Sequence, residues 1–198
     1  IQDATVNGTI DSWGGASSTK YDEDEFKLVM ENVSVNYTES DITGSYTANS
    51  CIAVNGGWAE IKNCTITSNV ASGIALDSCD ALVENCTISV DVGQEEVPPE
   101  YLMYNKYVSA GIIAAGTSED TMTIQNCSIT AAGDYSCGIH ARAMKDQVIN
   151  VRDVEIDAPV GVFTSSTGTL PGAYFVYVEG TYVPIEGGEP ISLQQSLG

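Results

Sequence analysis

One seven-residue pattern of alternating apolar and polar residues recurs along the chain. It reads IKNCTIT at 61–67, VENCTIS at 83–89 and IQNCSIT at 124–130, with looser copies at 30–36 and 151–157. A fainter copy is expected at 5–11. Alternation of this kind predicts short β-strands whose successive side chains point to opposite sides. Recurrence of one unit predicts a fold made of stacked repeats.

A second set of short apolar runs lies between the copies of the heptad. These runs are centred on Ile52, Ile74, Ile112, Ile139 and Val162. Spacing from a second run to the next heptad varies little, whereas spacing from a heptad to its second run includes long stretches at 36–50 and 90–109. The pattern is typical of an all-β fold, a single-stranded right-handed parallel β-helix of about six to seven rungs, with its insertions on one edge.

The asparagine in the heptad is expected to be structural. Asn can adopt a left-handed backbone at a bend between two strands, and its amide can bond to the adjacent rung. On that basis we expect loss of one amide to leave backbone groups unpaired, at about 1–3 kcal/mol. The outward positions Glu31, Lys62 and Glu84 alternate in sign, which favours the same alignment. The expected structural ladder is Asn32, Asn63, Asn85 and Asn126.

Three of the six cysteines occupy the same position of the heptad. Cys64, Cys86 and Cys127 therefore fall in one inward column, where free thiols acting as small hydrophobic groups are expected rather than disulfides between rungs. Cys51, Cys79 and Cys137 fall at strand starts or turns, and the pattern leaves their redox state open. No CxxC motif or His/Cys cluster indicates a zinc site.

The composition predicts one domain over 1–198, with an N-terminal rung or cap at 1–27, core rungs at 28–169, and a last rung with a cap or tail at 170–198. The last rung is expected at 178–183. No apolar run reaches the ~18 residues of a membrane span. With 27 acidic and 7 basic residues the net charge is −20, which disfavours nucleic acid and anionic membranes as partners.

The N-terminal part of the chain has two further features. The chain begins with Ile1 and shows no signal-peptide pattern, so we interpret it as a mature or trimmed part of a longer protein. The acidic run at 22–25 lacks the glycine and the spaced ligands of a calcium loop, which favours a solvated turn.

The two long insertions predict a groove, because they leave rungs on either side of the short repeat around Asn63. The first insertion carries Tyr37 and Tyr46. Tyrosine offers a polar ligand both an apolar ring and a hydroxyl, although packing of the insertions is an equally good reading. The expected ligand-binding tyrosines are Tyr101, Tyr104 and Tyr107.

Beside the groove, the outward residues of the second runs form a strip. Asp77, His140 and Arg142 lie on it, and Asp134 and Tyr135 come close in sequence. His140 is the only histidine, and it is expected at the surface. These side chains are candidate ligand contacts, although a lone surface histidine beside an arginine is more often incidental.

The sequence resembles the pectate-lyase-like superfamily of right-handed β-helices in its NCTI…SGIAL cadence, and AAGDYSCGIHA at 131–141 resembles bacterial adhesin-like and carbohydrate-binding β-helix repeats. The resemblance covers 30–164 and implies the fold. Polygalacturonase-like members have an Asp-Asp pair where this chain has Val70, Ala71 and Ser72, which removes the two carboxylates of hydrolysis. A lyase reading would use Arg142 with His140 and Asp134, beside calcium.

We therefore predict a secreted or cell-surface noncatalytic module, monomeric and without a cofactor, that binds a glycan or a host or cell-surface polysaccharide in the groove. The alternative is a polysaccharide lyase or glycoside hydrolase acting on an acidic polysaccharide. Ranks of outward hydroxyls around Thr65, Thr87 and Ser128 also raise ice binding, although Glu155 and Asp157 interrupt them.

Overall fold

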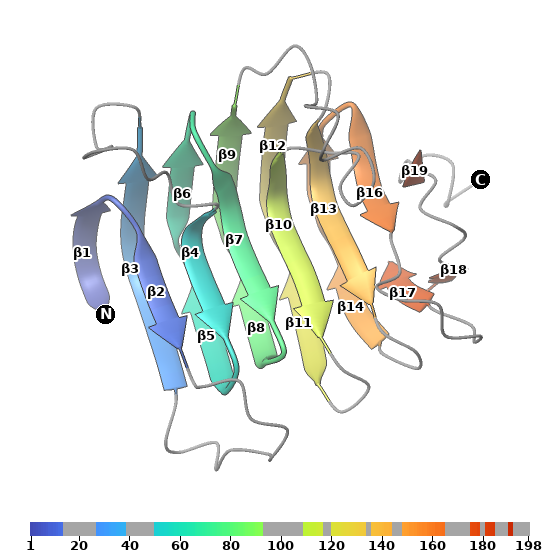
Figure 1. Cartoon of the computed structure of the whole chain (residues 1–198), viewed down its shortest axis with the longest axis horizontal. Helices are drawn as coiled ribbons and strands as arrows, with labels where there is room; N and C mark the ends of the chain where they lie inside the picture. Colours follow the sequence, from blue (N-terminus) through green and yellow to red (C-terminus); the bar gives the residue numbers. More distant parts are fainter. Residues whose placement is uncertain are drawn as a thin grey trace.

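The computed structural model describes residues 1–13, 27–38, 50–92, 109–116, 120–133, 136–143, 148–164, 175–178, 181–184 and 190–191, and this part of the chain is built from β-strands (Figure 1). The strands stack in parallel and in register into three faces that the chain visits in turn. Neighbours within a face come from successive repeats, which is the arrangement expected of a parallel β-helix.

The three faces are named A, B and C in chain order. Face A contains β5 (Trp58–Lys62), β8 (Asp80–Glu84), β11 (Thr121–Gln125), β14 (Val148–Arg152) and β17 (Phe175–Val178). Face B contains β1 (Gln2–Asn7), β6 (Thr65–Ser68), β9 (Thr87–Asp91), β12 (Ser128–Ala132) and β15 (Glu155–Asp157). Face C contains β2 (Ile10–Trp13), β4 (Ser50–Asn55), β7 (Ser72–Asp77), β10 (Ser109–Gly116), β13 (Ser136–Ala143) and β16 (Val160–Thr164).

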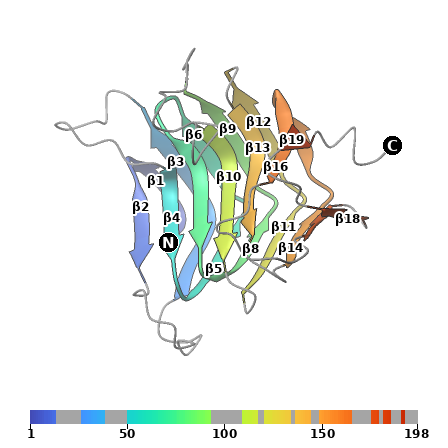
Figure 2. The same ribbon diagram turned by 45° about the vertical axis from the view of Figure 1, so that its right-hand side comes forward.

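Strand β3 (Lys27–Tyr37) joins faces A and B. Its first half pairs with β5, and its second half pairs with β1 and β6. In the later repeats the same path is divided into two strands at the asparagine. Figure 2 shows face C lying in front of face B, so that the two faces enclose the interior between them.

The bends between faces A and B have a left-handed backbone, as the sequence predicted. The φ angles are 54° at Asn32, 53° at Asn63 and Asn85, and 52° at Asn126. The side chains are exposed, however. The Asn32 amide donates a hydrogen bond to Oδ1 of Asp3 on the adjacent rung at 3.0 Å, whereas the later asparagines reach the next rung through their main-chain N–H groups, for example from Asn63 to the carbonyl of Glu84 at 3.0 Å. Loss of an amide therefore acts chiefly through backbone strain, and the expectation of buried unpaired partners is wrong.

The faint repeat near the N-terminus has a different register from the expected one. Gln2 pairs with Glu31 and Ala4 with Val33, so Asp3, with φ 49°, occupies the bend. The repeat is therefore 1–7 and not 5–11. The error came from aligning Asn7 with the ladder, whereas an aspartate takes the left-handed position here, as Asp153 does in the last copy with φ 49°.

The interior consists of inward columns in which like residues stack on like. Ile61, Val83 and Ile124 form one column, and all three are fully buried. Ile66, Ile88 and Ile129 form another. Cys64, Cys86 and Cys127 lie in the column after the bend at 1–3% exposure, and all six cysteines are free and buried, which confirms the prediction for these three.

The C-terminal part departs from the expected rung at 178–183. Strand β18 (Thr181–Pro184) pairs antiparallel with β17, and β19 (Pro190–Ile191) pairs antiparallel with β16. The chain therefore reverses here instead of adding another parallel turn. The number of rungs and the domain limits stay predictions, because parts of both ends lie outside the described residues.

Candidate functional site

The strands of face B all end at one edge of the coil, where the chain crosses to face C (Figure 1). We call it the B–C edge. The first long insertion connects the end of β3 to β4, and the second connects the end of β9 to β10. Both therefore leave and return at the B–C edge, on the first and third of three successive rungs. This is the arrangement expected from the spacing.

Between them, the rung of β6 and β7 crosses the edge by a short turn. The Ser68 hydroxyl, 3% exposed, accepts hydrogen bonds from the N–H groups of Val70 at 3.1 Å and Ala71 at 3.0 Å. Asn69 is exposed at the turn. The buried Ser68 hydroxyl thus fixes the turn, which stays close to the coil between the points where the two long insertions begin.

Buried serines line the start of face C, and the sequence analysis missed them. Ser72 accepts a hydrogen bond from the N–H of Ala110 at 3.1 Å, and the Ser136 hydroxyl lies 2.9 Å from the carbonyl of Ala131 and 2.7 Å from that of Gly133. The signal was present, since a serine recurs one to three residues before four of the five apolar runs: Ser50, Ser72, Ser109 and Ser136. Ser72 and Ser136 satisfy backbone groups at the crossing.

The structure separates part of the expected strip from the B–C edge. Asp77 and Arg142 fall in one column with Ala115 between them, so their backbones are about 10 Å apart. Arg142 lies six residues beyond Ser136 along β13, or about 20 Å from the edge. Asp77 is exposed, and its Oδ1 accepts a hydrogen bond from the Ser78 hydroxyl at 3.0 Å. At Arg142 the description covers the backbone only.

His140 does not occupy the surface position that the sequence analysis gave it. It stands in register with Ile113 and Phe163, as expected, but its exposure is 3%. Ala110 and Cys137 on the same strands form a second buried apolar cluster, separate from the main core. Alternation predicts which side of a strand a residue takes, but it cannot say what covers that side. The prediction of a solvent-facing histidine is wrong.

The tyrosines of the predicted groove fall outside the described residues. These are Tyr101, Tyr104 and Tyr107, together with Tyr46, Tyr135 and Asp134. Tyr37, at the root of the first insertion, is 5% exposed and packs in the core. Tyr37 therefore has a packing role in the core, and it is the one tyrosine of the two insertions that lies within the described residues.

Residues 50–170 match the family model of the right-handed β-helix region. The chain belongs to the right-handed β-helix family. Neither a curated protein nor a solved structure matches it. The family match accounts for the fold, and this β-helix must be assigned a function from its own surfaces.

The thiols of this β-helix are poor nucleophiles or are out of reach. Burial raises the pKa of Cys51 to about 11 and that of Cys79 to about 12. Within the column, hydrogen bonding to Cys127 and Cys64 raises the pKa of Cys86. The hydrogen bond with Cys86 lowers the pKa of Cys64 to about 7, but that side chain is 1% exposed. A substrate in solvent cannot reach it.

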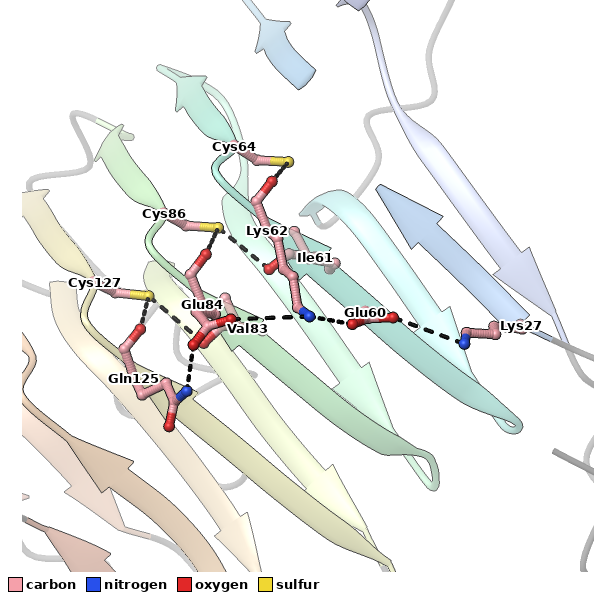
Figure 3. A network of polar contacts seen from close by, with 10 residues as sticks. All are labelled: Lys27, Glu60, Ile61, Lys62, Cys64, Val83, Glu84, Cys86, Gln125 and Cys127. Atoms are coloured by element: carbon pink, nitrogen blue, oxygen red, sulfur yellow. Dashed lines mark hydrogen bonds and ion pairs between the residues drawn. The ribbon is translucent and has the colours of Figure 1, made fainter. Parts of the chain in front are cut away.

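The outer side of face A carries a ladder of charges across the rungs (Figure 3). Lys62 pairs with Glu60 on its own strand and lies 3.9 Å from Glu84 on the next. Lys27 reaches Glu60 at 3.7 Å, and its Nζ lies 3.8 Å from the centre of the Trp58 ring. Alternating signs in register indicate a stabilising role for this ladder.

The described residues contain neither a metal-binding cluster nor a membrane-spanning helix. No group of three or more His, Cys, Asp or Glu side chains among them is arranged to hold a metal ion. In the same part of the chain, no helix has the length and hydrophobicity to cross a bilayer.

Proposed function

We propose that this β-helix is a noncatalytic module, secreted or displayed at a cell surface, that binds a glycan at the B–C edge as a monomer. The observation that carries the proposal is the common origin of the two long insertions. Both leave the B–C edge, and the short Ser68 turn lies between their roots. Long insertions gathered on one side of a repeat fold commonly form its binding surface.

The chemistry of the chain favours an uncharged polysaccharide as the ligand. A net charge of −20 repels uronate chains, sulfated chains and phosphate polymers. The second insertion supplies Tyr101, Tyr104 and Tyr107, whose rings can stack on sugar faces while their hydroxyls form hydrogen bonds. Asp77 and Arg142 lie too far along face C to share one small ligand with the edge, so they are secondary contacts for a longer chain.

Glycan-array binding tests the proposal. The wild type is compared with a triple variant, Tyr101→Ala, Tyr104→Ala and Tyr107→Ala, and with the matched triple Phe variant, which keeps the rings. We expect the Ala variant to lose binding at least tenfold and the Phe variant to lose less. Equal signals from wild type and the Ala variant exclude these tyrosines, and the absence of any signal from the wild type overturns glycan binding.

A lyase is the second candidate, because Arg142 and Asp77 share one column of face C. An arginine that abstracts a proton would produce unsaturated sugars from an acidic polysaccharide. The assay follows ultraviolet absorbance with pectate and alginate, with and without calcium. Activity that Arg142→Ala abolishes would replace the binding proposal, and absence of absorbance on both substrates argues against the lyase.

A further inference from the structure

The outer side of face B presents two straight columns of short uncharged polar side chains. Register along β1, β3, β6, β9 and β12 aligns each residue with its counterpart on the next strand. We call this set the face B array. One column is Thr5, Ser34, Thr65, Thr87 and Ser128, and the other is Asn7, Asn36, Thr67, Ser89 and Thr130.

The array is accessible and regular. Thr5, Asn7 and all six positions on β6, β9 and β12 are exposed, whereas Ser34 and Asn36 are half-buried. In-register strands repeat about every 4.8 Å, and residues two apart on a strand are about 6.6 Å apart. Hydroxyl and amide groups therefore stand on a fixed lattice over about 19 Å, supported beneath by the buried isoleucine column.

The lack of charge in the array distinguishes it from the outer side of face A. The chain carries 27 acidic residues, yet none of these ten positions is charged. The neighbouring face A places Glu31, Lys62 and Glu84 at equivalent outward positions. The lack of charge holds over β1, β3, β6, β9 and β12, and the two columns end in charged residues on the next strand, at Glu155 and Asp157 of β15.

A lattice of hydroxyls selects for a particular kind of ligand. A single hydroxyl that exchanges water for a mobile ligand gains little net free energy. The binding free energies of ten groups in fixed register add up only for a ligand whose own polar groups are fixed at a matching repeat. Such a ligand loses conformational freedom once for all ten contacts, and not once for each contact. The ligand class is therefore a rigid, repeating, uncharged solid and not a soluble oligosaccharide.

Crystalline polysaccharide and ice are two solids of this kind, and the array favours the first. Five of the ten positions carry a threonine methyl, and the others are serine or asparagine, so the surface lacks a continuous apolar floor. Carboxylates border it at Asp91, Glu155 and Asp157, all exposed. These anions accept hydrogen bonds from sugar hydroxyls, whereas their tightly held hydration disturbs a water lattice. We propose that the face B array binds the surface of an insoluble uncharged polysaccharide, independently of the B–C edge.

Co-sedimentation with microcrystalline cellulose, chitin and insoluble β-1,3-glucan tests the proposal. We expect the wild type to sediment with at least one of them, and Thr65→Lys with Thr87→Lys to reduce the bound fraction at least tenfold. Thr123→Lys is the matched control, because Thr123 is an outward strand position on face A. It should bind like the wild type. Melting curves must show that each variant is folded.

Further arms separate the possible outcomes. Triple Val substitution at Thr65, Thr87 and Thr130 keeps shape but removes hydroxyls, and should weaken binding even if the Lys variant fails to fold. The Tyr101/Tyr104/Tyr107 Ala variant should still sediment, which separates this surface from the B–C edge. Binding should survive 1 M NaCl, since no charge pairs form. Failure to sediment, equal binding by the face B variants, or thermal hysteresis without polysaccharide binding each overturns the proposal.

Discussion

A single backbone angle decides the shape of each bend between faces A and B. Every described copy of the repeat has a left-handed residue at this point: Asp3, Asn32, Asn63, Asn85, Asn126 and Asp153. For most L-residues this conformation costs about 1–2 kcal/mol, and short polar side chains tolerate it best. The bends could be predicted from the asparagines and from Asp153, whereas Asp3 was missed because the first copy was aligned on Asn7.

Replacement of Asn85 tests the energetic role of the bend. Asn85→Ala should lower the free energy of unfolding by about 1 kcal/mol, since alanine pays the steric cost of a positive φ without a compensating side chain. Asn85→Gly is the matched control and should cost less. Urea denaturation measures both. Equal loss in the two variants would show that the side chain matters more than the angle.

The glycine column of face C makes a second residue-scale prediction. A Cβ on Gly111 would lie 2.8 Å from the carbonyl oxygen of Gly138 and closer still to the Ile129 methyl Cγ2. Gly111→Ala should therefore destabilise the fold by about 1–3 kcal/mol through overpacking. Urea denaturation of this variant gives the cost.

Ile129→Ala removes the methyl group that blocks the new side chain. The double variant should consequently be more stable than the sum of the two single losses predicts, because the alanine partly fills the cavity. Strict additivity would contradict the proposed contact between Gly111 and the column of face B.

At the scale of elements, register was the most predictable property. The heptad columns fixed which strands pair, and the alternating signs of Glu31, Lys62 and Glu84 appear in register in face A. The reversal at β18 had a signal that was missed, since only Glu179 and Gly180 separate β17 from β18 in the sequence, and parallel strands need a much longer connection. Local pattern gives a strand and its faces, whereas its direction depends on the turn before it.

The charge ladder on face A gives a pH prediction. The hydrogen bond from Lys62 lowers the pKa of Glu60 below its ordinary 4.5 in the folded protein. A lowered folded pKa adds stability above pH 4.5, and that stability is lost as the pH falls through the folded value. The wild type should thus be more stable than Glu60→Gln at pH 7, and the difference should vanish in acid. Both carboxylate and ammonium are exposed to solvent, so the difference is small and decreases at high salt.

Thermal melting of the two proteins between pH 7 and pH 3 measures this difference. Glu84→Gln serves as a comparison, since Glu84 lies 3.9 Å from Lys62, at the long end of an ion pair. A gap between wild type and Glu60→Gln that persists unchanged at pH 3 would contradict the linkage.

At the scale of the whole molecule, protection should vary along the axis of the coil. The inward residues Ala4, Val6 and Ile10 of the first rung are half-buried, whereas Ile66 and Ile74 are fully buried. Hydrogen–deuterium exchange should consequently be faster in β1 and β2 than in β6 and β7, because local opening there exposes less apolar surface. Uniform exchange along the coil would indicate one cooperative unit.

The placement of the insertions could be predicted from the sequence, whereas the burial of His140 could not. The unequal spacing between heptads and apolar runs predicted that both long insertions lie at one edge of the coil. The first insertion does begin and end at the B–C edge, after Tyr37 and before Ser50. The burial of His140 could not be predicted, because it depends on what covers face C and not on β13 itself. Likewise, the face B array was seen only in part, since Thr5 and Asn7 join it through the corrected register of β1.

The confinement of long insertions to the B–C edge has a practical consequence. Residues 39–49 begin and end at neighbouring strands of a coil whose register is fixed elsewhere, so a foreign peptide of similar length can be grafted between Thr38 and Ser50 without shifting any column. An insertion in the Ser68 turn should not be tolerated, since the Ser68 hydroxyl accepts hydrogen bonds from the N–H groups of Val70 and Ala71 and thereby fixes the turn. We therefore expect the B–C edge to tolerate foreign peptides at the crossing from β3 to β4 and not at the Ser68 turn.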